Sequence, residues 1–129
     1  SLLAEVPDDP EANLLAGEIL VQQHQYEQAE TYVARCGKLR EDLQPRLHIL
    51  RGQIYSQTGR IPEAISEYKL GLANDPDGSL HYQLARLYQK SGNTTAASEQ
   101  IRISKQLRER WDNQAHVALE QRSTDLSKQ

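Results

Sequence analysis

Two series of small residues recur along this chain in one register, and this repeat constrains the fold more than any other feature. Members of the first series lie 35 and 33 residues apart: Gly17, Gly52 and Ala85. The second series keeps the same two spacings: Ala29, Ala64 and Ala97. Two independent landmarks that share one period indicate a true structural repeat, with each copy forming one supersecondary unit.

Each copy of the repeat has the pattern of two helices joined by a short break. Apolar residues fall at helical spacing through Leu14–Val21, Leu47–Tyr55 and Leu80–Tyr88. Gly59 and Gly92 follow the last two of these segments, and His24 takes that place in the first copy. Glycine favours the left-handed conformation in which a helix often ends. No alternating strand pattern competes, so we expect an all-α chain of three helical hairpins.

The small residues predict where the two helices of each hairpin cross. Gly17 should meet Ala29, and the later copies should repeat this contact with Gly52 on Ala64 and Ala85 on Ala97. Large tyrosines at other positions are expected to fill the space between neighbouring hairpins: Tyr55, Tyr68 and Tyr88.

The pattern resembles the tetratricopeptide repeat, whose signature has Leu-Gly, Tyr, Ala, an aromatic residue and Pro at set spacings. Residues 45–77 match best, with these residues at the signature positions: Arg51-Gly52, Tyr55, Gly59, Ala64, Tyr68 and Asp75-Pro76. The usual Trp of the first helix is replaced in every copy, by Asn13, His48 and His81. The resemblance, closest in style to bacterial members, implies a right-handed α-solenoid with repeats at about 10–44, 45–77 and 78–110.

The ends of the chain are expected to differ from the repeats. Residues 1–7 have the pattern of the tail of a preceding repeat helix, so we expect the chain to be a fragment of a longer protein. The repeat domain should cover residues 8–122, because a capping helix continues the third hairpin to about Arg122. A kink near Asp112 is an alternative. Residues 123–129 are expected to form a polar tail.

Composition and charge exclude several classes of function. The net charge is −3, which gives no overall field for nucleic acid, and no apolar run is long enough to enter a membrane directly. Neither the cytoplasm nor the periplasm is excluded as the compartment. The single cysteine, Cys36, occupies a small-residue position of a second helix, where a buried packing thiol is expected. His48 and His81 share one position in adjacent hairpins without forming a metal motif, and residues 75–78 lack the later ligands of a calcium loop. We therefore expect no enzyme activity, no cofactor and no metal site.

The resemblance also implies a binding groove, because the first helices of tetratricopeptide arrays line a concave face that binds peptides or helices. The first copy contributes Glu11, Leu14, Glu18, Val21 and Gln22. The second contributes Arg46, Ile49, Gln53, Ser56 and Gln57. The third contributes Ser79, Tyr82, Arg86, Gln89 and Lys90. Leu14, Ile49 and Tyr82 should form an apolar row on the floor, with an acidic end at the first copy and a basic end at the third.

The function expected from these features is a non-catalytic scaffold that binds a protein or peptide partner in the groove. The lysine and asparagine residues with which chaperone-binding members hold a terminal carboxylate are absent from these positions. Self-association as a homo-oligomer, through the N-terminal edge or the C-terminal helix, is one alternative. An accessory domain of a secretion or polymer-export assembly is another.

Overall fold

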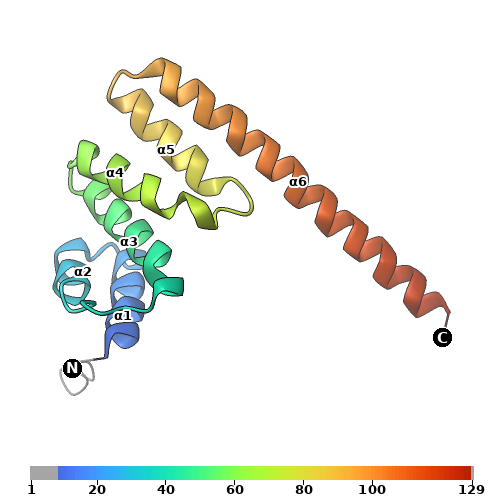
Figure 1. The fold of residues 1–129 in the computed structure, drawn as a ribbon, viewed down its shortest axis with the longest axis horizontal. Coiled ribbons are helices and arrows are strands. Elements are labelled where there is room, and N and C mark those ends of the chain that lie inside the picture. The colour runs from blue at the N-terminus through green and yellow to red at the C-terminus, as the bar shows by residue number, and fades with distance from the viewer. Residues whose placement is uncertain (1–8, 129) are drawn as a thin grey trace. The chain divides into compact units, whose positions relative to one another are not determined.

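A computed structural model describes residues 9–128 of the chain, and every regular element in that range is helical (Figure 1). The α-helices are α1 (Pro10–Gln22), α2 (Tyr26–Val33), α3 (Gln44–Gln57), α4 (Ile61–Gly71), α5 (Ser79–Lys90) and α6 (Thr94–Ser127). Short 3₁₀ turns cover Glu41–Leu43 and Leu72–Asn74. The expected all-α solenoid class is confirmed. The chain divides into an N-terminal unit, residues 1–74, and a C-terminal unit that begins at Asp75.

The N-terminal unit is organised around α3, which packs against α1, α2 and α4. Its core joins buried side chains from the first two hairpins: Leu14, Ala29, Val33, Cys36, Leu39, Leu47, Leu50 and Ile54. Gly17 allows α1 to approach this core closely, since a Cβ there would lie 2.9 Å from Leu50 Cδ2 and 3.8 Å from the Ala29 carbonyl oxygen. Gly17 therefore permits close packing against the next hairpin as well as within its own hairpin.

Local signals fix where these helices begin and end. Asp9 caps α1 by accepting hydrogen bonds from the amides of Glu11 (3.1 Å) and Ala12 (3.4 Å). Pro45 and Pro62 lie in the first turns of α3 and α4, where a missing amide hydrogen has no cost. His24 adopts a positive φ of 61° at the break of the first hairpin, the conformation that Gly59 and Gly92 supply in the others.

Helix α2 is shorter than the repeat predicts, which corrects the placement of Cys36. The helix ends at Val33, so Cys36 lies in the following loop rather than on a second helix. Its thiol is nonetheless fully buried in the core, as expected, and contacts the Tyr32 carbonyl oxygen at 3.5 Å. The buried Asn13 side chain donates to the Arg35 carbonyl at 3.3 Å. The residue that replaces the usual Trp therefore anchors the loop after α2.

The C-terminal unit consists of α5 packed against the first half of α6. Asp75 holds the start of α5, because its buried carboxylate accepts from the amides of Leu80 (3.0 Å) and His81 (2.9 Å). Gly78 brings the turn against α6, where the Ser104 hydroxyl donates to the Gly78 carbonyl at 2.8 Å. A Cβ on Gly78 would lie 2.5 Å from the Ser104 carbonyl oxygen, and its φ of 80° also favours glycine.

Helix α6 is a single uninterrupted helix of 34 residues and extends to Ser127. It passes Asp112 without a break, so the alternative of a kink is wrong. It also continues beyond Arg122 into the segment expected to be a polar tail. The reason is that no Gly or Pro follows Asn93, and polar side chains on an exposed helix do not disturb its backbone hydrogen bonds. The helix tail expected over residues 1–7 lies outside the described residues.

Candidate binding surface

The expected groove faces of α1 and α3 lie side by side in the N-terminal unit, where an ion pair joins them. Arg46 of α3 donates from Nε to Glu18 Oε2 at 3.2 Å and makes a second, shorter bond to the other carboxylate oxygen. The Glu18 hydrogen bonds raise the pKa of the Arg46 guanidinium. The tetratricopeptide resemblance assigns both residues to the groove, so the structure brings together two predicted positions that are 28 residues apart.

Two carboxylates of the acidic end expected at the first hairpin have cationic partners. Glu18 is paired with Arg46, and Glu11 lies 3.0 Å from Arg40 of the connecting loop, which Asp42 also contacts at 3.2 Å. A nearby opposite charge reduces the field that a carboxylate presents to a distant ligand. The acidic end is therefore weakened, and the charge gradient along the groove stays a prediction.

The apolar row expected on the groove floor is also corrected. Leu14 is 1% exposed and belongs to the core of the N-terminal unit. Ile49 is half-buried against Gly71 of α4. A Cβ added to Gly71 would lie only 2.8 Å from Ile49 Cγ1. Of the three residues in the expected row, only Tyr82, which is 51% exposed, presents a large apolar surface. The reason is that the apolar stripe of a first helix faces its neighbouring helices as well as the groove.

The remaining groove positions of α1 and α3 provide a mixed, mostly polar surface. Val21 is half-buried and packs against the core. Gln53 and Ser56 are half-buried, whereas Gln22 and Gln57 are exposed. A hollow of about 410 Å³ opens where this surface reaches the start of α1. Its lining includes the predicted groove residues Glu11, Leu14 and Arg46. It also includes Leu15, on another side of α1, and Arg40 and Leu43 of the connecting segment, which the repeat positions do not describe.

Helix α5 of the C-terminal unit presents an exposed aromatic ring together with unpaired cations. Tyr82, Arg86, Gln89 and Lys90 are all exposed and fall on one side of the helix at spacings of four, three and one. Within residues 9–128, Arg86 and Lys90 take part in no ion pair. No Asp or Glu occurs from Ser79 to Lys90. The basic character expected at the third hairpin is therefore retained on α5.

A second hollow in the N-terminal unit lies between α2 and α3. It has a volume of about 330 Å³, and its lining includes Glu30, Arg51, Tyr55 and Arg60. Arg60 pairs with Glu30 and places its guanidinium carbon 4.5 Å from the centre of the Tyr55 ring. Arg60 is therefore already engaged on both sides and is not free to bind a ligand in this hollow.

The two histidines that share one repeat position, His48 and His81, are engaged in structural contacts. His48 Nδ1 lies 2.7 Å from a Glu67 carboxylate oxygen, and His81 Nδ1 lies 2.6 Å from Asp75.

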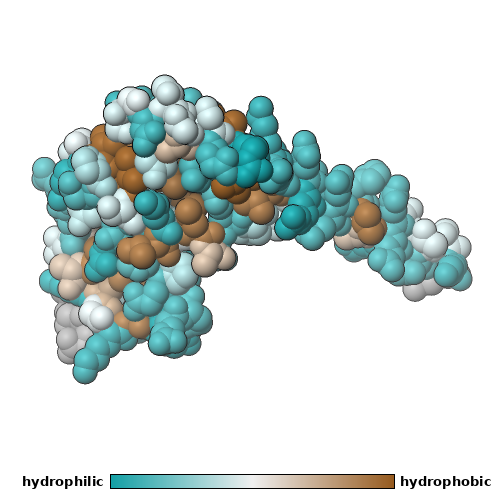
Figure 2. Space-filling model, turned by 45° about the horizontal axis from the view of Figure 1, so that its top comes forward, coloured by the Kyte–Doolittle hydropathy of each residue, from teal (hydrophilic) through white to brown (hydrophobic). Residues whose placement is uncertain are grey.

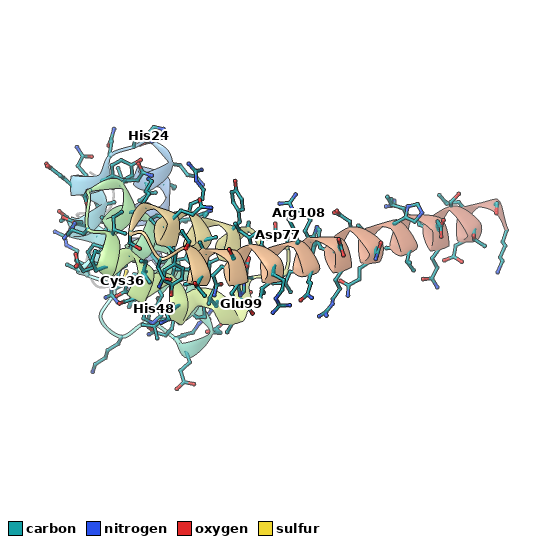
Figure 3. All side chains as sticks on the ribbon, turned by 90° about the horizontal axis from the view of Figure 1, so that it is seen from above. His24, Cys36, His48, Asp77, Glu99 and Arg108 are labelled. Carbon is teal, nitrogen blue, oxygen red and sulfur yellow. The ribbon has the colours of Figure 1, made fainter. Side chains whose placement is uncertain are left out.

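Burial raises the pKa of the Cys36 thiol. The amide of Ser79 lowers the pKa of Asp77, with a smaller contribution from Arg108 beside it (Figure 3). Among the described residues, no three His, Cys, Asp or Glu side chains are grouped to hold a metal ion.

Hydrophobic and hydrophilic residues are unevenly distributed over the surface. Figure 2 shows that the second half of α6, beyond its contact with α5, is largely hydrophilic with an isolated hydrophobic patch. In the described range, no helix is both long enough and apolar enough to span a bilayer.

Comparison with known proteins supports the repeat. A family model described as "Tetratricopeptide repeat" matches residues 1–54, and a second model with the same description matches residues 45–77. A solved structure named "MamA MSR-1 C2" superposes with a TM-score of 0.72 over 84% of this chain, at 24% sequence identity. This chain spans 62% of that chain, and at this identity the likeness concerns the fold alone. No curated protein matched the sequence.

Proposed function

Because this chain belongs to the tetratricopeptide repeat family, whose members are generally non-catalytic scaffolds for protein–protein interaction, we propose that it binds a peptide or helix through its first-helix surfaces. The observation that carries this proposal is the exposed face of α5, with Tyr82, Arg86 and Lys90. An exposed aromatic ring beside two unpaired cations suits a ligand with an apolar anchor flanked by carboxylates.

The surface of α1 and α3 contributes differently. Glu18 and Arg46 satisfy each other, so this surface offers mainly polar contacts, at Gln22, Gln53 and Ser56. We therefore expect ligand selection to depend mainly on α5.

The test is binding to a peptide array that pairs acidic and basic versions of sequences with one apolar anchor. The intact chain should retain the acidic peptides, and retention should weaken as salt is raised, since exposed charges are screened. Tyr82→Ala should reduce affinity by about tenfold or more, the usual effect of losing an aromatic hot spot.

A matched pair of variants separates specific recognition from net charge. Arg86→Glu with Lys90→Glu should abolish retention of the acidic peptides. Lys38→Glu with Lys69→Glu changes the net charge equally at two exposed sites of the N-terminal unit and should leave retention unchanged. Equal losses from both pairs would show that overall charge, and not the α5 face, attracts the peptides.

Self-association through the C-terminal helix is a second candidate function. The observation that favours it is the row of exposed apolar side chains on α6, with Trp111 47%, Leu119 66% and Leu126 62% exposed. The remaining hypothesis, an accessory role in a secretion or polymer-export assembly, would use the same α5 surface and stays a prediction.

A further inference from the structure

The side of α6 that packs against α5 continues along the helix after α5 has ended. Ala97 and Ser104 are buried on this side, and Leu107 is half-buried. At about 100° of rotation per residue, one stripe of the helix continues from them within a sector of about 100°. We call the following evenly spaced residues of this sector the α6 stripe: Leu107, Trp111, Ala115, Ala118, Arg122 and Leu126. Arg108, Leu119 and Asp125 lie at or beside its edges. From Trp111 onward every member is exposed, so a face continuous with a packed one lacks a partner.

The spacing of the α6 stripe is the same in both directions along the chain. Successive members are separated by four, four, three, four and four residues. A second copy of the helix in the opposite direction therefore places each member opposite another one. The layers are Leu107 with Leu126, Trp111 with Arg122, and Ala115 with Ala118, each formed twice around a two-fold axis.

The side chains in these layers are complementary only in the antiparallel arrangement. Arg122 would lie against the Trp111 ring of the second copy, where a guanidinium binds an aromatic face favourably. Within one chain these two residues are 11 positions apart, about 16 Å along the helix, so they cannot meet. A parallel pair would instead place Arg122 on Arg122, which is a repulsive contact. The alanines at the centre allow the two helices to approach closely.

Charges at the edge of the stripe favour the same partner. In the antiparallel register Arg110 of one copy and Asp125 of the other lie on the same side of the pair and within about two residues of each other. Opposite charges that flank a helix pair set its register and orientation. We propose that the α6 stripe binds a second copy of this chain, forming an antiparallel pair of α6 helices with a two-fold axis between His116 and Val117.

This inference rests on the second candidate function and is independent of peptide binding by α5. Two helical segments of about 20 residues form an interface at the small end of the range for specific complexes, so association should depend on concentration. The mass measured by sedimentation equilibrium should rise from 14.7 kDa towards twice that value as the full chain is concentrated from about 1 μM to 1 mM. A mass that stays at 14.7 kDa throughout would overturn both the inference and self-association.

Trp111 is the only tryptophan of the chain and lies on the stripe, so its fluorescence reports on the interface directly. Its emission maximum should move to shorter wavelength over the same concentration range, because pairing removes the ring from water. An increase in mass without this shift would place the contact elsewhere.

Two adjacent residues provide a matched pair of variants. Ala118→Glu places a charge at the centre of the stripe, whereas Val117→Glu adds the same charge on a side that faces away from it. Both sites are exposed, so both variants should keep the helix content of the parent by circular dichroism. We expect Ala118→Glu to remain monomeric and Val117→Glu to associate like the parent. Association of Ala118→Glu would exclude this stripe.

Cross-linking tests the direction of the helices. Ala115→Cys and Ala118→Cys are made as separate variants of different mass and mixed, with Cys36 retained because it is fully buried. An antiparallel pair should give disulfides mainly between the two variants. Disulfides mainly between identical chains would disprove the antiparallel arrangement even if the protein proves to be dimeric.

Discussion

Gly52 of α3 faces the ring of Tyr68 of α4, and the two are so close that no methyl group fits between them. A Cβ on Gly52 would lie 2.5 Å from Tyr68 Cδ1 and 2.6 Å from Cε1. The repeat predicts that Gly52 meets Ala64 and that Tyr68 fills the space between hairpins. The Tyr68 ring is 3% exposed and also covers the glycine within its own hairpin. The small residue is needed because an aromatic ring lies against it.

Gly52→Ala should therefore destabilise the N-terminal unit. The added methyl must displace the ring, and overpacking of this kind costs about 1–3 kcal/mol. Gly37→Ala is the matched control, because nothing lies within 4 Å of a Cβ at that position. Thermal unfolding followed by circular dichroism should show a lower Tm for the first variant and an unchanged or slightly higher Tm for the second. Equal Tm values would mean that the Gly52–Tyr68 contact is not tight in solution.

Asp75→Ala should weaken the start of α5. It removes the acceptor for the amides of Leu80 and His81 and for the His81 ring, and loss of a capping acceptor costs about 1–2 kcal/mol. Amide hydrogen exchange by NMR should show faster exchange at Leu80 and His81. Asp77→Ala is the comparison, since its carboxylate accepts from the Ser79 amide instead. Unchanged protection of Leu80 and His81 in Asp75→Ala would contradict the proposed cap.

The Glu18–Arg46 ion pair should be measurable as a coupling between α1 and α3. A double-mutant cycle with Glu18→Gln and Arg46→Gln should give a coupling free energy of about 0.5–1 kcal/mol, as expected for a partly exposed pair. The coupling should decrease as salt is raised. A coupling of zero at low salt would mean that Glu18 and Arg46 remain two free charges in the expected groove.

The stability of the N-terminal unit should fall in alkaline solution because of Tyr68. Burial raises the pKa of Tyr68 from 10.0 to about 12. Because the folded state holds this proton more tightly than the unfolded state does, the stabilising effect is complete below pH 10 and is lost as the pH rises towards 12. The free energy of unfolding in urea should therefore decrease more steeply with pH above about 10 for the parent than for Tyr68→Phe. Parallel curves for the two proteins would exclude this explanation.

The hairpins can be predicted from the amino-acid sequence, because the signals that form them are local. The spacing of small residues, the helical period of the apolar ones, and the His24, Gly59 and Gly92 breaks are properties of neighbouring positions. These features sufficed to predict an α-solenoid and to place Cys36 in the core. The groove positions that the tetratricopeptide resemblance implies also identified the basic face of α5, since no acidic residue lies near Arg86 or Lys90 within that helix.

Which side chains of a first helix remain open to a ligand depends on how the helices pack together. The helical period places Leu14 and Tyr82 at equivalent positions, yet Leu14 is enclosed by its neighbours and Tyr82 is exposed. Likewise, the sequence cannot show that Glu18 meets Arg46, because their contact depends on how α1 packs against α3. Burial and ion pairing arise between segments that are distant along the chain, whereas a repeat pattern specifies only the segment in which it occurs.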